Sequence, residues 1–148
     1  MNTEKNIRIY PWYQAAAGFL PWMPVFFLYF SQTVSLDKAI ELGAIYYLAV
    51  VIFEVPSGYF SDRFGRRTTL LCAAVFALAS YSVFLFASAF TWFAMGQILL
   101  AGAIAFQSGS DSSLLYDSLT ELNRQQDYEA HEARSQQFGM TSLAISVI

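Results

Sequence analysis

A short charged stretch around position 62 holds the side chains best placed to do chemistry in this 148-residue sequence. Asp62 ends an apolar segment, where a carboxylate needs a cationic partner, and Arg66 follows four positions later. A charge-assisted pair of this kind can lock one arrangement of helices and release another. Gly65 permits the sharp turn that a short loop requires. Gly58 carries no side chain, so another helix can approach closely there.

The segments that must position these groups are visible as stretches without charge. Residues 9–36, 42–53 and 68–110 contain no Asp, Glu, Lys or Arg. A membrane helix needs about 20 residues, and one helix of 43 residues would be roughly 65 Å long. The third stretch therefore predicts two helices and a turn, which we place at 88–91. The predicted spans are 11–30, 39–60, 69–86, 92–115 and 138–148. The fifth span is only about half as long as a membrane crossing requires. We therefore expect the chain to be an N-terminal piece of a longer protein.

The distribution of basic residues predicts the orientation. With the N-terminus in the cytoplasm, nearly all Lys and Arg lie in short cytoplasmic segments, and only Lys38 lies outside. For Arg63 and Arg67 this topological role, with solvated side chains, is an open alternative to a structural one. The polar segment 118–137 lacks Pro and Gly and is interpreted as a solvated, helical cytoplasmic connector. The basic residues assigned to the cytoplasm are Lys5, Arg8, Arg63, Arg66, Arg67, Arg124 and Arg134.

Two acids stand inside predicted spans, where ionisable groups are costly and usually face the bundle interior or a water-filled cavity. Glu54 and Asp111 are on the cytoplasmic halves of the second and fourth spans, and the first span enters at the same depth with Tyr13 and Gln14. A buried carboxylate there could exchange a proton. The alternative is a structural hydrogen-bond network near the cytoplasmic gate. We favour the structural interpretation for Glu54 and leave both open for Asp111.

The stretch GYFSDRFGRR resembles the loop 2–3 signature of the major facilitator superfamily, G-x-x-x-D-R-x-G-R-R. Every fixed position matches, and the stretch falls between the second and third apolar spans on the positive side. The resemblance implies an all-α integral membrane bundle, of which this chain would supply four transmembrane helices and the start of a fifth, within the first six-helix half. The matching residues are Gly58, Asp62, Arg63, Gly65, Arg66 and Arg67.

The resemblance also implies roles for other residues. An acid at the cytoplasmic end of helix 4 pairs with the loop arginine in this family, and Asp117 matches it, giving a latch of Asp62, Arg66 and Asp117 that holds the outward-facing state. Helices 1 and 4 line the central cavity in the family. The candidates for substrate or proton contact are therefore Asp111, Gln14 and Gln107, with Glu54 beside the latch.

One position departs from the pattern of many proton-coupled members, which carry an arginine early in helix 4 within R-x-x-x-G. The matching register here gives Gln97 and Ala101. A neutral amide does not stabilise a carboxylate as an arginine does, so coupling would have to use another acid. The segments EVPSG and DSSLLYDSL also look like a bacterial branch of uncharacterised or drug-efflux-like members, which implies the bacterial plasma membrane.

Composition excludes several function classes. Hydrophobic residues make up 56% and charged residues 13% of the chain, against roughly 25% charged in soluble domains. A net charge of −3 without a basic patch argues against nucleic-acid binding. The chain has no phosphate loop, no nucleophile beside a base and no metal cluster, so neither enzyme chemistry nor a cofactor is implied.

Three functions remain. The first is secondary transport of a small solute by alternating access, driven by a proton or solute gradient, with the second half of the same protein as partner. The second is a complete small four-helix exporter that dimerises. The third is a membrane receptor or scaffold on the same fold, which would need no coupling acid.

Overall fold

The computed structural model describes residues 3–20, 26, 28–29 and 32–147, and in these ranges every regular element is a helix. The expectation of an all-α fold is confirmed there. The helices form two compact units, which are described separately. The α3–α5 unit comprises residues 27–111, and the α1–α7 unit comprises residues 1–26 and 112–148. The second half of the predicted first span falls largely outside the described residues.

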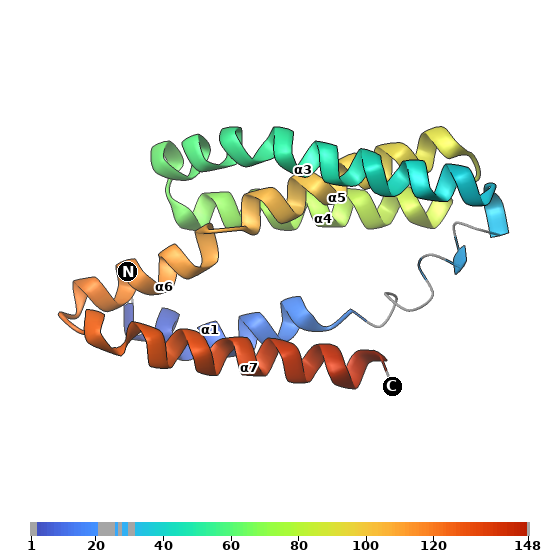
Figure 1. The fold of residues 1–148 in the computed structure, drawn as a ribbon. Helices are drawn as coiled ribbons and strands as arrows, with labels where there is room; N and C mark the ends of the chain where they lie inside the picture. Colours follow the sequence, from blue (N-terminus) through green and yellow to red (C-terminus); the bar gives the residue numbers. More distant parts are fainter. Residues whose placement is uncertain (1–2, 21–25, 27, 30–31, 148) are drawn as a thin grey trace. The chain divides into compact units, whose positions relative to one another are not determined.

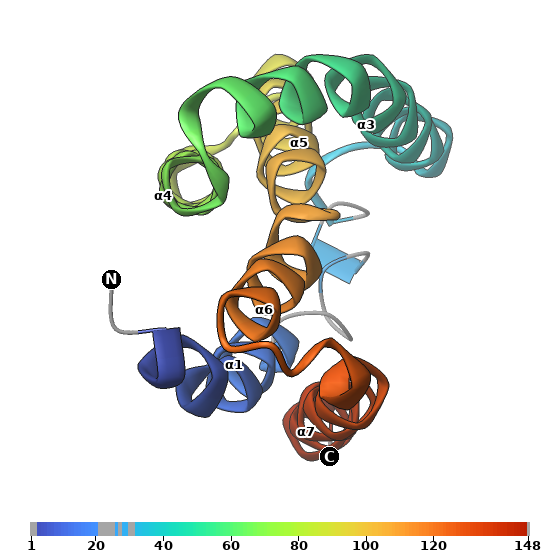
Figure 2. The same ribbon diagram turned by 90° about the vertical axis from the view of Figure 1, so that its left-hand side faces the viewer.

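In the α3–α5 unit, α5 (Phe90–Gln107) lies between α3 (Leu36–Phe64) and α4 (Arg66–Phe86), as Figures 1 and 2 show. Small residues on α5 let both neighbours approach closely. At Gly96, for example, an added Cβ would collide with the ring of Phe84, and the Gly96 carbonyl accepts a 2.8 Å hydrogen bond from Ser80 Oγ. The close packing of α4 on α5 therefore depends on the absence of a side chain at Gly96.

Aromatic rings join the three helices at one level. Phe106 of α5 has its ring centroid 5.4 Å from Phe60 of α3 and 5.4 Å from Phe76 of α4. Such offset ring pairs contribute about 0.5–1.5 kcal/mol beyond their buried area. The cluster fixes α3 and α4 against α5 near the end of α3 that carries the charged turn.

Three described segments are long and apolar enough to cross a membrane, namely Leu36–Phe64, Arg66–Phe86 and Phe90–Glu121. They overlap the second, third and fourth predicted spans. Many of their large apolar side chains are exposed, including Val55 and Phe86. Exposed apolar residues on this scale are what a helix bundle presents to lipid or to further helices. The turn between α4 and α5 falls at residues 87–89, which overlaps the predicted turn at 88–91.

The predicted span 92–115 is divided in the structure. The helix α5 ends at Gln107 and α6 (Ser110–Glu121) begins after a break in which Gly109 has φ of +73°. At Ser108 ψ is 126°, outside the helical region, so the backbone hydrogen-bond ladder is interrupted. The prediction of one continuous helix is therefore wrong at these two residues.

In the α1–α7 unit, α1 (Thr3–Gly18) and α7 (Tyr128–Val147) run side by side in the same direction (Figure 1). They approach each other closely where Gly18 meets Gly139, since a Cβ added to Gly18 would collide with the Gly139 carbonyl. The first part of α1 also packs on α6, and a short 3₁₀ turn, η1 (Gln125–Asp127), leads from α6 into α7. The buried cluster of this unit consists of Ile7, Tyr10, Leu115 and Leu119.

The segment predicted as a connector, 118–137, is not wholly solvated. Its first residues end α6 and its last residues begin α7. Ser118 and Ser135 are 2% and 1% exposed, respectively. This part of the prediction was wrong because both buried hydroxyls find partners: Ser118 Oγ accepts a 3.4 Å hydrogen bond from Asn6 Nδ2 on α1, and Ser135 Oγ donates one of 2.7 Å to the His131 carbonyl of its own helix.

Candidate functional site

Arg66 contacts two side chains at the charged turn between α3 and α4. Its Nη1 lies 3.0 Å from Asp62 Oδ1 and donates a second hydrogen bond of 2.7 Å to Ser61 Oγ. The Asp62 side chain is 74% exposed. An ion pair that is open to water contributes at most about 1 kcal/mol. The pair can therefore form and break at small cost, which a conformational latch requires.

A second contact ties this turn to the start of α6. Ser110 Oγ donates a 3.2 Å hydrogen bond to Ser61 Oγ, and both side chains are buried, at 3% and 4% exposure. Arg66 therefore binds a serine that is itself bound to α6. This contact was not predicted, because no local pattern in the sequence pairs two serines that are 49 positions apart.

The turn itself depends on Gly65, which has φ of +84°. An L side chain is strained at such an angle, so glycine is the residue that fits there. The amide of Gly65 donates to the Ser61 carbonyl at 3.0 Å, and the Gly65 carbonyl accepts from Thr69 Oγ1 at 3.0 Å. These bonds end α3 and begin α4 without a longer loop.

The remaining arginines of the signature have different surroundings. Arg63 donates to Tyr59 Oη at 3.2 Å, and its guanidinium lies 5.6 Å from the ring centroid of Phe64. Arg67 is exposed. Both side chains are at the surface of the α3–α5 unit, so the solvated interpretation stays open for them.

No described helix approaches Gly58. A Cβ added there would meet nothing within 4 Å. The buried face of α3 runs instead through Ser57 and Ser61, and Gly58 is exposed beside it. The close approach expected at this glycine is therefore not made within the described residues.

The candidate acids and amides of the α3–α5 unit lie toward the same end as the turn. Asp111 is half-buried in the first turn of α6, where the helix dipole favours a carboxylate. Gln107 is half-buried at the end of α5. Glu54 is exposed, so the expectation that it faces the interior is not met within this unit.

Asp117 is exposed on the part of α6 that belongs to the α1–α7 unit, whereas Asp62 and Arg66 belong to the α3–α5 unit. The same division separates Gln14 from Glu54 and Asp111. The three-residue latch and the convergence of polar groups at one depth therefore stay predictions.

Within the α1–α7 unit, Gln14 belongs to a chain of hydrogen bonds that reaches α7. Its Nε2 donates to Tyr10 Oη at 2.9 Å, and Tyr10 Oη donates to Glu132 Oε2 at 3.1 Å. Gln136 Nε2 donates to the other carboxylate oxygen, Oε1, at 3.1 Å. Tyr10 is 5% exposed, so its hydroxyl depends on these partners. The arrangement connects Gln14 on α1 to Glu132 on α7 through the Tyr10 hydroxyl.

Sequence reasoning did not select Glu132 as a candidate. The only local signal was its helical spacing from Gln136, four positions on. Its partner on α1 is 122 positions away in the sequence. Within the polar segment 118–137, the sequence alone did not distinguish Glu132 from the neighbouring acids that were expected to be solvated.

Comparison with known proteins gave two matches. The family model described as Major Facilitator Superfamily matches residues 13–126. An uncharacterised MFS-type transporter, YxaM of Bacillus subtilis (strain 168), is 32% identical over 69 residues, which cover 47% of this chain. The chain spans 17% of the length of that relative. No solved structure matches.

Proposed function

The chain belongs to the Major Facilitator Superfamily, and we propose that the whole protein carries a small solute across the membrane by alternating access. The observation that supports this most directly is that Arg66 donates hydrogen bonds to both Asp62 and Ser61, and that Ser61 is in turn hydrogen-bonded to Ser110. One cation there joins the ends of two membrane helices to the start of a third. Such a joint has to rearrange when the cytoplasmic ends of the helices separate.

In the proposed cycle, Asp117 approaches Arg66 in the outward-facing state and completes the latch with Asp62. When the cytoplasmic side opens, Asp117 withdraws, and the contacts of Arg66 with Asp62 and Ser61 rearrange. The low cost of breaking an exposed ion pair lets substrate or proton binding shift the equilibrium by a few kcal/mol. Gly58, open on α3, is the surface against which a helix of the second half would move.

The proposed transport is proton-coupled efflux of a drug-like or metabolic solute. Asp111, Gln14 and Gln107 are the proposed contacts for substrate or proton, with Glu54 beside the latch. The support within the structure is the half-buried position of Asp111 and the hydrogen-bonded chain from Gln14 to Glu132. Since Gln97 replaces the arginine of many proton-coupled relatives, the proton would bind one of these acids without an arginine beside it.

The proposed location is the bacterial plasma membrane, with the N-terminus in the cytoplasm. The basic residues of the α3–α4 turn, and Arg124 just before η1, support this orientation by the positive-inside rule. The substrate would enter from the cytoplasmic side and leave on the outer side.

The transport proposal is tested with the full-length protein in energised everted vesicles, with ethidium as the fluorescent probe. Faster loss of ethidium fluorescence than in vesicles without the protein, abolished by a protonophore, supports proton-coupled efflux. Equal rates in both vesicle preparations contradict efflux of this class of solute.

Alternating access is tested independently of the substrate. A single cysteine replaces Ser113 in a Cys72→Ala background, and its rate of labelling by a membrane-impermeant maleimide is measured in inside-out vesicles. Asp62→Asn should raise the rate several-fold by favouring the inward-open state. Asp37→Asn, at the opposite end of α3, is the matched control and should leave the rate unchanged. An unchanged rate with Asp62→Asn contradicts the latch.

A further inference from the structure

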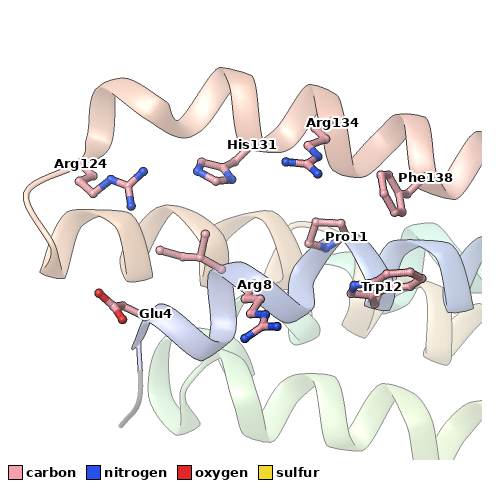
Figure 3. A pocket seen from close by; sticks show the side chains of 9 residues that line it. Glu4, Arg8, Pro11, Trp12, Arg124, His131, Arg134 and Phe138 are labelled. Carbon is pink, nitrogen blue, oxygen red and sulfur yellow. The ribbon is translucent and has the colours of Figure 1, made fainter.

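A groove of about 440 Å³ lies between α1 and α7, within the α1–α7 unit. Figure 3 shows Arg124, His131, Arg134 and Phe138 along one side and Glu4, Arg8, Pro11 and Trp12 along the other. Ile7 completes the lining. The groove is distinct from the charged turn of the α3–α5 unit and from the Gln14–Glu132 chain, and the proposed transport cycle does not use it.

One end of the groove carries an excess of positive charge. Arg8, Arg124 and Arg134 line it together with His131. The opposing carboxylates are Glu4, which also lines the groove, and Asp127, whose Oδ2 lies 2.7 Å from Arg124 Nε. The three guanidiniums outnumber these two carboxylates.

The other end is aromatic. Trp12 and Phe138 meet edge to face with ring centroids 5.6 Å apart, and the Arg134 guanidinium lies 6.0 Å from the Phe138 ring. Along α1, Arg8 precedes Trp12, and along α7, Arg134 precedes Phe138. Since the two helices run in the same direction, the groove changes from charged to aromatic along its length. In the proposed topology, the aromatic end points into the membrane.

We propose that this groove binds an anionic phospholipid of the cytoplasmic leaflet, with its phosphate among the arginines and an acyl chain over Trp12 and Phe138. Guanidinium groups bind phosphate oxygens through paired, charge-assisted hydrogen bonds. Basic pockets between membrane helices on the cytoplasmic side suit anionic headgroups. The order of charge and aromatic surface matches the order of headgroup and chain in a lipid.

Such a lipid would join α1 to α7 next to the Tyr10–Glu132 hydrogen bond. Arg8 comes from α1, whereas Arg124 is the residue before η1 and Arg134 belongs to α7. One phosphate contacted from both sides would therefore hold the two helices together. The inference rests on the proposed orientation of the chain, but not on transport activity.

The test measures lipid retention by the full-length protein in detergent, by native mass spectrometry after incubation with phosphatidylglycerol or phosphatidylcholine. Wild type should retain phosphatidylglycerol in preference. Arg8→Gln and Arg134→Gln should each lower that retention about fivefold, the effect expected for one basic residue near an anionic lipid surface. Lys5→Gln is the matched control, because Lys5 is an exposed cation on the same helix that does not line the groove.

A second variant tests the aromatic end. Trp12→Ala should lower retention of long-chain phosphatidylglycerol while leaving retention of the dihexanoyl form unchanged, because the short chains do not reach the aromatic pair. Melting temperatures in phosphatidylcholine verify that each variant is folded. If Arg8→Gln does not fold, Arg134→Gln alone carries the charge test.

Three results would overturn the proposal. Equal retention of the two lipids by wild type would show no preference for an anionic headgroup. An equal loss with Lys5→Gln would assign the preference to diffuse charge. Displacement of the lipid by millimolar inorganic phosphate would identify a site for free phosphate. Because retention is measured without transport, ethidium efflux can fail while this proposal stands, or the reverse.

Discussion

Tyr10 on α1 donates a 3.1 Å hydrogen bond from its hydroxyl to Glu132 on α7 and accepts one of 2.9 Å from Gln14. The two helices thus share a partly buried polar contact as well as the close approach of Gly18 and Gly139. A bond of this kind reports on the relative position of α1 and α7. It would change if the two helices separated during a transport cycle.

Replacing Tyr10 with Phe should lower the free energy of unfolding by about 1–3 kcal/mol, because the ring still packs but Gln14 and Glu132 lose their shared partner. Glu132→Gln should have a smaller effect, since an amide oxygen still accepts from Tyr10. Denaturant unfolding of the full-length protein in detergent measures both. Equal stability of Tyr10→Phe and wild type would show that the hydroxyl contributes nothing to the packing.

Replacing Ser61 with Ala should lower stability by about 1–2 kcal/mol, because Arg66 and Ser110 both lose a buried partner. The double-mutant cycle of Ser61→Ala and Ser110→Ala should show a coupling energy of at least about 0.5 kcal/mol. Ser82→Ala is the control, since its exposed hydroxyl bonds only a carbonyl of its own helix. If the effects of the two substitutions on the free energy of unfolding simply add, the Ser61–Ser110 contact contributes nothing to stability.

The contacts that could be predicted from the sequence are those set by local spacing. Asp62 and Arg66 are four positions apart, and their ion pair needs only the helix end and the turn at Gly65. The turn between α4 and α5 was predictable because a charge-free stretch of 43 residues is too long for one crossing. In each case, the spacing of two residues or the length of a segment is sufficient to make the prediction.

The contacts that could not be predicted join residues far apart in the chain. Ser61 meets Ser110, and Tyr10 meets Glu132, only because helices pack in one particular register. The break before α6 was also missed. Gly109 stands in a stretch that is apolar enough to cross a membrane, and a glycine inside such a stretch is compatible with an unbroken helix. Its positive φ is set by the fold and could not be predicted from the neighbouring residues.

Replacing Gly139 with Val should destabilise the protein by about 1–3 kcal/mol, because even a Cβ would lie 3.2 Å from the Gln14 carbonyl oxygen. Gly43→Ala is the matched control. A Cβ there meets nothing within 4 Å, and alanine favours a helix by about 0.8–1.0 kcal/mol over glycine. Thermal unfolding of both variants tests the contact, and equal melting temperatures would show that α1 and α7 pack differently in the whole protein.

A cysteine that replaces Phe64 should react with an impermeant maleimide only from the cytoplasmic side. Phe64 ends α3 and is 53% exposed, beside three arginines that the positive-inside rule places in the cytoplasm. The assay compares intact cells with inside-out vesicles in a Cys72→Ala background. Labelling in intact cells would reverse the proposed orientation, and with it the leaflet that supplies lipid to the α1–α7 groove.

Asp111 is the residue on which proton coupling can be decided. It lies in the first turn of α6, next to Ser110 and half-buried, so either a structural role at the helix N-terminus or proton exchange fits its position. Proton release on adding ethidium to the full-length protein in weakly buffered detergent solution separates the two. Release by wild type and by Asp37→Asn, but not by Asp111→Asn, would make Asp111 the proton carrier. If Asp111→Asn binds ethidium and releases protons as wild type does, the carrier is another acid, and Glu132, already bonded through Tyr10 to Gln14, is the next to replace.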